Sequence, residues 1–471
     1  MEEEKKVSKK KGFRVPHTYV LIICMLILAT VLTYLIPAGS YDRVIDPNTG
    51  RSVPDVETFK RMENTPVNFF NMIQAIPKGM ADAASIVFFV FIIGGSFAMI
   101  QSTGAIDAGV VKLIGKLKNK EKIMIPAVMF LFSILGFTIG AAEEIIPFIP
   151  IAVMIARGLG YDDIVGIAMV STGAAVGFCG GMLNPFTTGI SQGIAELPLY
   201  SGIGLRTVGY IIFYIIAVWY VTRYASKVKA DPTKSVLYGL KTSEVDENKT
   251  VDSYEFTTRH KITLSAVIIG LGIMIYGVLR YGWFINQISA MFIIIAVASI
   301  FIGGVNTTDA ANAFVKGAKD IAFGAIVIGL ARSVLVVLEQ GNILDSIVYY
   351  SANALILLPR QIISVGIFAI TSVINFVIPS GSGLNATLMP IMAPLSDAVG
   401  ITRQTAVLAV TYGDAFTNQI IPTSGALLGA LGIANVPYEK WLKYNWKLPV
   451  IWSICGAMIL IIATTINYGP F

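Results

Sequence analysis

The sequence is poor in charged residues and in the residues that usually build catalytic and metal sites. Charged residues make up 14% of its 471 residues, whereas a soluble domain carries about 25%. It has two histidines and three cysteines, and it contains no HExxH or CxxC motif. Both histidines, His17 and His260, stand in the flanks of apolar segments. These absences argue against a soluble protein, a metal centre and a membrane enzyme.

The cysteines and the net charge exclude two further classes of function. Cys24, Cys179 and Cys455 all fall in apolar segments without a pairing pattern, so we expect buried thiols with no metal or redox role. The formal net charge is +6, but the basic residues gather between the apolar runs. There they set the orientation of a membrane protein and do not indicate nucleic-acid binding.

Long apolar runs take the place of charge. Hydrophobic residues make up 55% of the chain, and the mean hydropathy is +0.72. We expect an all-α polytopic protein of the bacterial cytoplasmic membrane. Its first span is retained, its basic N-terminus (residues 1–17) lies inside and its C-terminus outside. We expect nine spans, at residues 18–37, 84–102, 163–196, 206–222, 262–279, 288–302, 321–338, 403–433 and 449–466.

The segments between the spans are polar or amphipathic. A polar loop is expected at 41–66 and a charged connector at 224–261. Amphipathic segments, which would lie at the membrane surface or as short arms across the bundle, are expected at 67–82, 108–122, 309–320 and 342–357.

Two stretches are too polar and too short-armed for ordinary spans. The first, GFTIGAAEEIIPFIP, places Glu143 and Glu144 between apolar arms of about 18 and about 12 residues. A full crossing needs roughly 20 residues, and an ionised group in the bilayer core costs about 2.5 kcal/mol or more. We expect a re-entrant hairpin over 123–160 that enters from the cytoplasm, with a full crossing as the alternative. A second hairpin is expected over 361–399.

Each expected hairpin is followed by a span that proline should break. Residues 163–196 contain Asn184-Pro185, and residues 403–433 contain Pro422. A proline removes a backbone donor and its ring clashes with the preceding turn, so both helices should unwind.

The second half of the chain repeats the first at a nearly constant offset. The KGMAD motif at Lys78 matches KGAKD at Lys316, an offset of 238 (316 − 78). The GIAELP motif at Gly193 matches GIANVP at Gly432, an offset of 239 (432 − 193). An odd number of expected crossings separates equivalent spans, so the second repeat (262–471) is inverted relative to the first (18–223). Inverted repeats with broken helices are typical of secondary transporters.

Four motifs at the tips and breaks carry a resemblance to a known family. They are GAAEEIIPFIPI, NPFTTGISQG, IPSGSGLNATLMPIMAPL and TNQIIPTSG. With them, nearly the whole chain resembles the YfcC-like family. That family groups with the C4-dicarboxylate anaerobic carriers and the arginine–ornithine type of basic amino acid antiporter in the ion-transporter superfamily. The resemblance implies an elevator-type transporter, in which a scaffold domain dimerises and a transport domain of hairpins and broken spans moves as a unit.

The two tips and the two breaks form the four walls of an expected substrate site. Their hydroxyls, amides and free carbonyls suit a small cation or a polar substrate. The expected site residues are Thr138, Gly140, Glu143 and Glu144 at the first tip, Asn184, Thr187 and Thr188 at the first break, Ser380, Ser382, Asn385 and Thr387 at the second tip, and Asp414, Thr417, Asn418, Thr423 and Ser424 at the second break. A Na⁺ ion, if one binds, is expected near Asn184 and Asn418.

The charge of these walls favours a ligand with positive charge. They hold Glu143, Glu144 and Asp414 but no Lys or Arg. The two glutamates either select a cation or only cap the second hairpin arm, and Asp414 either meets the ligand or only bonds to a broken helix end. Arg332, the nearest intramembrane cation, either meets a substrate carboxylate or pairs locally within the scaffold.

The leading functional prediction is a secondary transporter of basic amino acids, an arginine/ornithine-type antiporter that works as a homodimer. The alternative is a Na⁺- or H⁺-coupled symporter of C4-dicarboxylates or other small carboxylates. Neither requires a cofactor or a nucleic acid. A channel is disfavoured because the sequence shows no continuous polar stripe.

Overall fold

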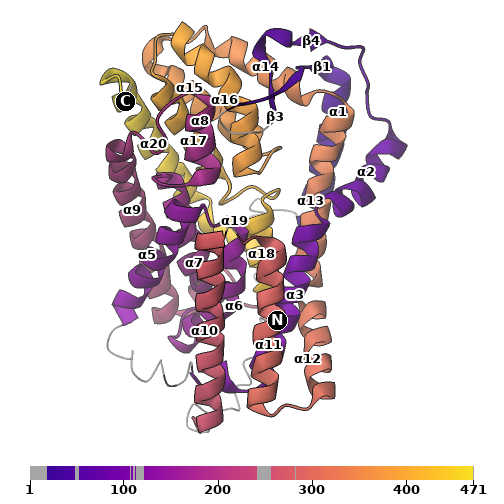
Figure 1. Ribbon diagram of the computed structural model, residues 1–471, viewed down its shortest axis with the longest axis vertical. Helices are drawn as coiled ribbons and strands as arrows, with labels where there is room; N and C mark the ends of the chain where they lie inside the picture. Colours follow the sequence, from indigo (N-terminus) through magenta and orange to yellow (C-terminus); the bar gives the residue numbers. More distant parts are fainter. Residues whose placement is uncertain are drawn as a thin grey trace, which may run out of the picture.

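The computed structural model describes residues 18–47, 52–106, 108–109, 112, 121–240, 256–281 and 283–469. Helices make up most of this part of the chain (Figure 1). The basic N-terminus, most of the amphipathic segment expected at 108–122 and part of the connector, 241–255, lie outside the described residues.

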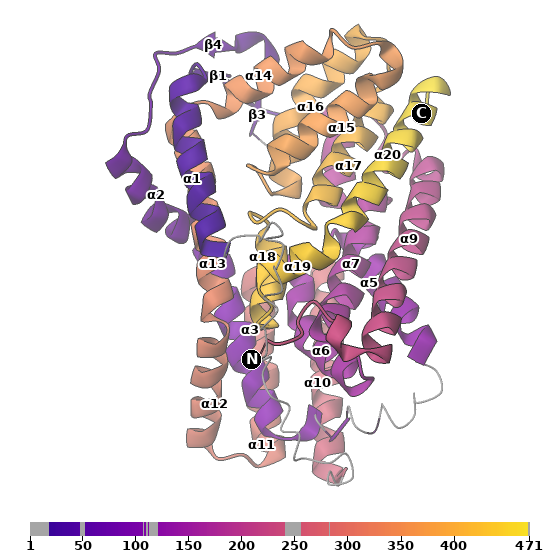
Figure 2. The same ribbon diagram turned by 180° about the vertical axis from the view of Figure 1, so that it is seen from behind.

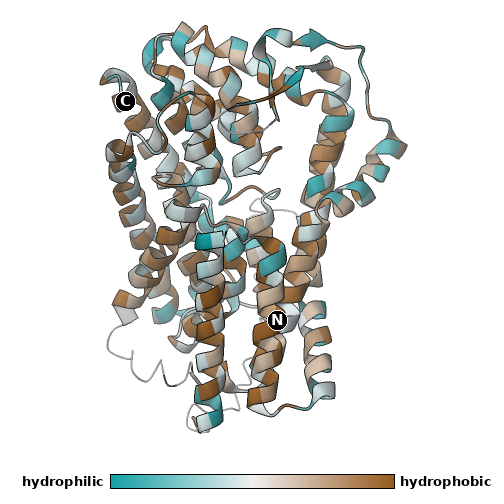
Figure 3. Cartoon of the chain, in the orientation of Figure 1, coloured by the Kyte–Doolittle hydropathy of each residue, from teal (hydrophilic) through white to brown (hydrophobic). Residues whose placement is uncertain are grey.

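Several helices are long and apolar enough to cross a membrane. In the described ranges there are six, or seven if the bent pair of α12 and α13 counts as one span. The six are α1 (Thr18–Leu35), α3 (Ala84–Ser102), the broken stretch Asp163–Ile194, α9 (Ile203–Ala230), α11 (Ile285–Gly303) and α20 (Lys447–Thr465). Figure 3 shows apolar residues along the long helices and polar residues toward the top and bottom of the molecule. The chain is therefore a multi-pass membrane protein, and the total of nine spans stays a prediction.

Seven helices form one group, which we call the frame group. They are α1, α2 (Phe69–Asp82), α3, α10 (Thr258–Tyr281), α11, α12 (Thr307–Asp320) and α13 (Ala322–Gln340). Within this group α2 packs against α13, and α12 packs against α3. A Cβ on Gly79 would lie 2.5 Å from the backbone N of Ser333, and one on Gly317 would lie 2.4 Å from the carbonyl O of Gly94. The repeated KG motif thus marks two equivalent contacts where only glycine lets the helices approach so closely.

Most of the remaining helices, long and short, form a second group, which we call the hairpin group. Its helices are α5 (Glu121–Ile139), α6 (Ile149–Gly158), α7 (Asp163–Gly180), α8 (Ile190–Ile194), α9, α15 (Arg360–Asn375), α16 (Gly381–Ala398), α17 (Arg403–Thr417), α18 (Gly425–Ile433), α19 (Tyr438–Asn445) and α20. Two short turns belong to it, η2 (Glu143–Phe148) and η3 (Pro185–Gly189).

The hairpin group is built twice on one plan. Helices α5 and α6 both pack against α7, and α15 and α16 both pack against α17. The pair α15 and α16 lies above α5 and α6 in both views (Figures 1 and 2). The two halves interlock at the centre, because α8 packs against α16 while α18 packs against η2 and α6. The tips and the breaks are thereby brought together.

The connector between α1 and α2, expected as a polar loop, holds four short strands and one short helical turn. They are β1 (Gly39–Ser40), β2 (Arg43–Ile45), β3 (Ser52–Pro54), η1 (Val56–Thr58) and β4 (Lys60–Arg61), and they pair antiparallel as β1–β4 and β2–β3. The connector is fixed to α14 (Leu344–Leu355), where Arg43 Nη2 lies 2.7 Å from Asp345 Oδ1. At its far side Val53 packs against Ile190 of α8 and Ala386 of α16.

Two expectations about this architecture were wrong. Cys179 is buried, but Cys24 is exposed and Cys455 is half-buried. Helix α9 runs on to Ala230, beyond the expected end at residue 222, and the turn η4 (Pro232–Lys234) follows it. Both errors have the same cause, because apolarity in a sequence does not distinguish a lipid-facing side chain from a buried one and does not locate the end of a helix in water.

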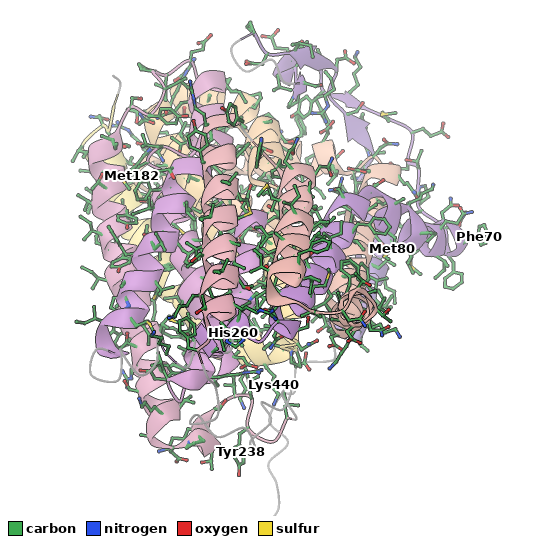
Figure 4. The ribbon with its side chains drawn as sticks, turned by 60° about the horizontal axis from the view of Figure 1, so that its bottom comes forward. Phe70, Met80, Met182, Tyr238, His260 and Lys440 are labelled. Atoms are coloured by element: carbon green, nitrogen blue, oxygen red, sulfur yellow. The ribbon has the colours of Figure 1, made fainter. Side chains whose placement is uncertain are left out.

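Helix α2, expected as an amphipathic segment, forms as a separate helix that lies at the edge of the molecule. Asn68 caps its N-terminus by accepting a hydrogen bond from the backbone N–H of Asn71. Phe69 and Phe70 are among its exposed residues, and Figure 4 shows Phe70 projecting away from the helix bundle. Its inner face packs on α13, so α2 is an arm of the frame group with an apolar outer edge.

Candidate functional site

A cavity of about 870 Å³ lies between the frame group and the hairpin group. The hairpin group contributes residues from both tips and both breaks. The frame group contributes the end of α2, the start of α3, the residues at the start of α11 and one face of α13. The polar and charged lining residues are Asp82, Ser85, Thr138, Glu143, Glu144, Ser171, Arg332, Ser380, Ser382, Asn418, Gln419, Thr423 and Ser424.

At the first tip the two glutamates open a short 3₁₀ turn. Glu144 is 8% exposed, and its Oε2 accepts a hydrogen bond of 2.8 Å from the backbone N–H of Ala142. Glu143 is half-buried and also lines the cavity. Within the part of the chain that the structure describes, no Lys or Arg forms an ion pair with either carboxylate. Glu144 therefore closes the loop just before the turn, and neither glutamate gives a side-chain cap to η2 or α6, while both side chains line the cavity.

Gly140 joins this tip to the first break. Its φ of +62° is a left-handed conformation that favours glycine. A Cβ at this position would lie 2.5 Å from Asn184 Oδ1. That oxygen accepts hydrogen bonds from the backbone N–H groups of Phe186 (2.9 Å) and Thr187 (3.2 Å), and so it caps η3. Gly140 in the sequence TIGAA thus leaves room for the side-chain amide of Asn184, which caps η3.

The predicted residues of the first break lie behind the cavity wall. Asn184, Thr187 and Thr188 are fully buried and do not line the cavity, whereas Pro185 and Phe186 do. Thr188 Oγ1 donates to the carbonyl O of Gly181 at 2.6 Å, at the end of α7. Two polar atoms remain without a partner among the described residues, Asn184 Nδ2 and Thr187 Oγ1.

The second tip presents a helix N-terminus in place of acids. Ser380 caps α16, accepting a hydrogen bond of 3.3 Å from the backbone N–H of Gly383, and Ser380, Gly381 and Ser382 line the cavity. Asn385 is buried behind them, where its Oδ1 accepts from Ser191 Oγ at 2.5 Å. The positive end of the α16 dipole consequently faces the cavity.

At the second break the acid is hidden and the amide is exposed to the cavity. Asp414 is fully buried and does not line the cavity, while Asn418, Thr423 and Ser424 do. Asn418 Nδ2 donates to Asp414 Oδ1 at 2.8 Å, and Asp414 Oδ2 has no partner in the described chain. Asn375 ties this break to the second hairpin by donating to Thr417 Oγ1 at 2.7 Å. Asp414 therefore lies in a layer beneath the cavity surface, and its contact with a ligand stays a prediction.

The tip residue Thr138 also lines the cavity, and its Oγ1 donates to the carbonyl O of Ile134 at 2.6 Å. Thr387, by contrast, is turned to the carbonyl O of Gly383 at 2.9 Å. Asn184 and Thr387 do not line the cavity, whereas Asn418 does. The two residues expected beside a Na⁺ ion, Asn184 and Asn418, therefore do not both line the cavity.

The frame group forms a fifth wall of the cavity, which the sequence analysis did not expect. Asp82 of α2 and Arg332 of α13 line the cavity from this wall, while Gln419, within the motif TNQIIPTSG, lines it from the second break. Arg206 is fully buried in the hairpin group, where its Nη1 lies 3.4 Å from Thr188 Oγ1. Asn375 alone had a usable signal, as an amide beside the second tip in an apolar arm.

The chemistry of this site is binding. The described residues contain no group of three or more His, Cys, Asp or Glu side chains that is placed to hold a metal ion. The cavity instead offers two carboxylates at the first tip, hydroxyls, amides and helix N-termini on the other walls of the hairpin group, and Asp82 and Arg332 on the wall of the frame group. Such a surface holds a small polar molecule without reacting with it.

Comparisons with known proteins identify the family to which the chain belongs. The profile of the C4-dicarboxylate anaerobic carriers matches residues 15–465. The chain belongs to this carrier family. Membership of a carrier family confirms that the protein is a membrane transporter and not an enzyme. It also confirms the family to which the tip and break motifs pointed.

The carrier has two full-length relatives at 30% identity. One is an uncharacterized protein of Haemophilus influenzae (strain KW20 / Rd), 30% identical and matched over 98% of this chain and 99% of its own. The other is YfcC of Escherichia coli (strain K12), provisionally named a basic amino acid antiporter, 30% identical over 97% of this chain and 98% of its own. The YdaH transporter of Alcanivorax borkumensis is 15% identical over 97% of this chain and 100% of its own, with a TM-score of 0.39, which is too low to support an argument.

Proposed function

We propose that this carrier is a secondary active transporter of basic amino acids that exchanges arginine for ornithine or a similar cation. The observation that carries the proposal is the pair Glu143 and Glu144, which lines the cavity without a basic partner among the described residues. Carboxylates left unpaired at such a depth are costly, and a guanidinium or ammonium group relieves that cost with charge-assisted hydrogen bonds. The provisional name of the Escherichia coli relative agrees with this substrate class.

The same carboxylates give a physical reason for exchange. Without substrate, the hairpin group carries two acids, Glu143 and Glu144, that form no ion pair among the described residues. Moving them across the membrane uncompensated costs several kcal/mol, whereas a bound cation neutralises them. The loaded group therefore crosses more readily than the empty one, and each crossing needs a cation.

We further propose that movement occurs by an elevator mechanism, in which the hairpin group slides past the frame group of a homodimer. The reciprocal packing of α2 on α13 and α12 on α3 supports an inverted repeat. The stacking of α15 and α16 above α5 and α6 supports two re-entrant hairpins that enter from opposite sides (Figures 1 and 2). Nine spans, an N-terminus in the cytoplasm and a C-terminus outside the bacterial cytoplasmic membrane complete this arrangement.

Purified protein in proteoliposomes tests the exchange. Vesicles loaded with unlabelled arginine or ornithine are expected to take up labelled arginine, whereas empty vesicles take up none. Vesicles loaded with succinate serve as the matched control. Arginine uptake into empty vesicles driven by a Na⁺ gradient would contradict the exchange mechanism.

A second candidate function, a Na⁺- or H⁺-coupled symporter of C4-dicarboxylates, is favoured by the family description and by one feature of the structure. Asp414 Oδ2 and Thr187 Oγ1 are buried without partners among the described residues, and a Cβ on Gly381 would lie 3.3 Å from Asp414 Oδ2 and 3.2 Å from Thr187 Cγ2. Oxygens beside an unwound helix are typical ligands of a coupling Na⁺ or H⁺. This candidate predicts succinate uptake into empty vesicles that depends on an imposed Na⁺ or proton gradient.

A further inference from the structure

Arg332 gives the cavity a positive pole on the wall opposite the hairpin tips. It is the one Lys or Arg among the lining residues in the described chain, and it projects from α13 of the frame group. Its Nε is buried and has no hydrogen-bond partner among the described residues. It forms no ion pair within the described ranges. Asp82 of α2 lines the same cavity, and the charge of Arg332 acts on Glu339, seven residues further along α13, but neither carboxylate forms an ion pair with Arg332 in the described residues.

A half-buried guanidinium that lines the cavity with its Nε buried and unpaired among the described residues favours binding of an anion. Leaving a buried charged donor unsatisfied costs more than an ordinary hydrogen bond gains. The planar fork of arginine matches the two oxygens of a carboxylate, which it binds through parallel hydrogen bonds. A carboxylate that entered the cavity would supply the acceptors that the protein itself does not provide in the described residues.

Helix N-termini reinforce this pole. The first residues of α16 (Gly381 and Ser382), of α18 (Gly425 and Ala426) and of α11 (Ile285) line the same cavity. These helices have 18, 9 and 19 residues, so each carries a full helix dipole. Partial positive charge at three helix starts and a full charge on Arg332 favour an anionic group. The acids of the first tip favour a cationic group in the same space.

We propose that Arg332 binds the α-carboxylate of the transported amino acid, and that it is the residue by which the carrier distinguishes a basic amino acid from its decarboxylated amine. This inference rests on the proposed function. The substrate then lies across the boundary between the two groups, with its cationic side chain toward Glu143 and Glu144 and its carboxylate toward Arg332. A basic amino acid satisfies both poles, an amine such as agmatine only the acidic one, and a dicarboxylate only the basic one.

The test compares arginine with agmatine, which has the same guanidinium and chain but no carboxylate. Each compound is added unlabelled outside arginine-loaded proteoliposomes, and its inhibition of labelled-arginine uptake is measured for the wild type and for Arg332→Gln. The wild type is expected to be inhibited at least about 30-fold more weakly by agmatine than by arginine. In Arg332→Gln this ratio should fall to about threefold, chiefly through weaker inhibition by arginine.

Two further variants keep the test decisive. Arg360→Gln removes an arginine outside the cavity, on the first turn of α15, and should keep the wild-type ratio. Arg332→Lys keeps the charge but loses the fork, and should give an intermediate ratio. Where Arg332→Gln does not transport, the same ratio is measured as competition for labelled-arginine binding to detergent-purified protein, and where it does not fold, Arg332→Lys decides.

The outcomes separate this inference from the proposed function. A wild type that does not exchange arginine overturns both. A wild type that exchanges arginine, with an arginine-to-agmatine ratio that Arg332→Gln and Arg332→Lys leave unchanged, overturns the role of Arg332 and leaves the proposed function standing. A fall of the ratio in Arg360→Gln equal to that in Arg332→Gln also overturns it.

Discussion

The junction between α6 and α7 and the junction between α16 and α17 hold the same ion pair with its charges exchanged. Arg157 Nε lies 2.5 Å from Asp163 Oδ1, and Arg403 Nη2 lies 2.8 Å from Asp397 Oδ2. The two pairs stand at one offset of 240 residues (397 − 157 and 403 − 163). Both halves therefore have an ion pair at this junction, but the acidic and the basic residue have exchanged positions.

The hairpin tips differ in the same way. At the offset of 239 residues that relates the GIAELP and GIANVP motifs, Ser382 takes the place of Glu143 (382 − 143). The first tip brings two acids to the cavity, and the second brings two serines and the N-terminus of α16. The shared plan therefore builds an unsymmetrical cavity, in which packing is repeated and charge is not. A substrate with two unlike ends fits such a cavity in one orientation.

The largest effect is expected from removing charge at the first tip. Glu144→Gln keeps an oxygen for the hydrogen bond from Ala142 N–H but loses the charge, so it isolates the electrostatic role. Arginine exchange in proteoliposomes should fall about 100-fold, since a hydrogen bond to a charged group is worth about 1.5–3 kcal/mol. Ser382→Ala at the second tip should change the rate by less than about threefold. Equal losses in the two variants would contradict the contrast between the tips.

A second prediction concerns the glycines at the two tips. Gly140→Ala places a Cβ 2.5 Å from Asn184 Oδ1 at a φ of +62° and should lower the free energy of unfolding by about 2 kcal/mol. Gly381→Ala meets its nearest neighbour, Phe178 Cζ, at 3.0 Å without a positive φ and should cost about 1 kcal/mol or less. Denaturation in mild detergent measures both.

The control for these glycines is Gly204→Ala, because a Cβ on Gly204 would meet nothing within 4 Å. This variant should unfold like the wild type. A Gly381→Ala variant less stable than Gly140→Ala would show that the second tip, not the first, is the more tightly packed.

The two ion pairs provide a third, smaller contrast. The side chain of Asp163 is 3% exposed, whereas that of Asp397 is 50% exposed. Double-mutant cycles with alanine should give a coupling energy of about 2 kcal/mol for Arg157–Asp163 and below about 1 kcal/mol for Asp397–Arg403. Raising the salt concentration should weaken the second pair more than the first. Equal coupling energies would contradict the expectation that burial makes the first ion pair stronger than the second.

The smallest effect is a pH dependence at the start of α7. Asp162 caps this helix, and at the same offset of 240 residues (402 − 162) the cap of α17 is the neutral Thr402. Burial raises the pKa of Asp162 above its ordinary value, although hydrogen bonds from Ser235 and Tyr224 oppose this. A raised folded-state pKa means that the ionised form destabilises the fold, and that this penalty disappears as the pH falls through the folded pKa.

Asp162→Asn removes that titration. The melting temperature of the wild type should therefore rise relative to the variant by about 2 °C as the pH is lowered from 7 to about 4, close to the ordinary pKa of an aspartate. The difference between the wild type and Thr402→Ala should not change over the same range. A wild type that loses stability relative to Asp162→Asn on acidification would reverse the assigned sign.

The sequence predicted the parts of this molecule that follow from local chemistry. Pro185 breaks its helix, Glu143 and Glu144 stand at a tip, and the KG motifs mark equivalent helix crossings. These features need only the rules of backbone geometry and of charge in a membrane. The family followed from the same motifs.

The remaining features depend on how distant segments pack. Arg332 reaches the cavity because α13 faces the hairpin tips, and no pattern within α13 shows this. Asp414 lies behind the cavity wall because the second tip covers it at Gly381. Cys24 is exposed because the same apolar letters serve both lipid and protein contacts.

The contact of Val53 has a mechanical consequence. The connector that carries it is anchored to α14 through Arg43 and Asp345, while Val53 itself rests on Ile190 and Ala386 of the hairpin group. If the hairpin group slides as proposed, it must either break this contact or extend the 33-residue connector (residues 36–68) between α1 and α2. A fluorophore at position 53 would then report the movement of the hairpin group from a place outside the substrate cavity.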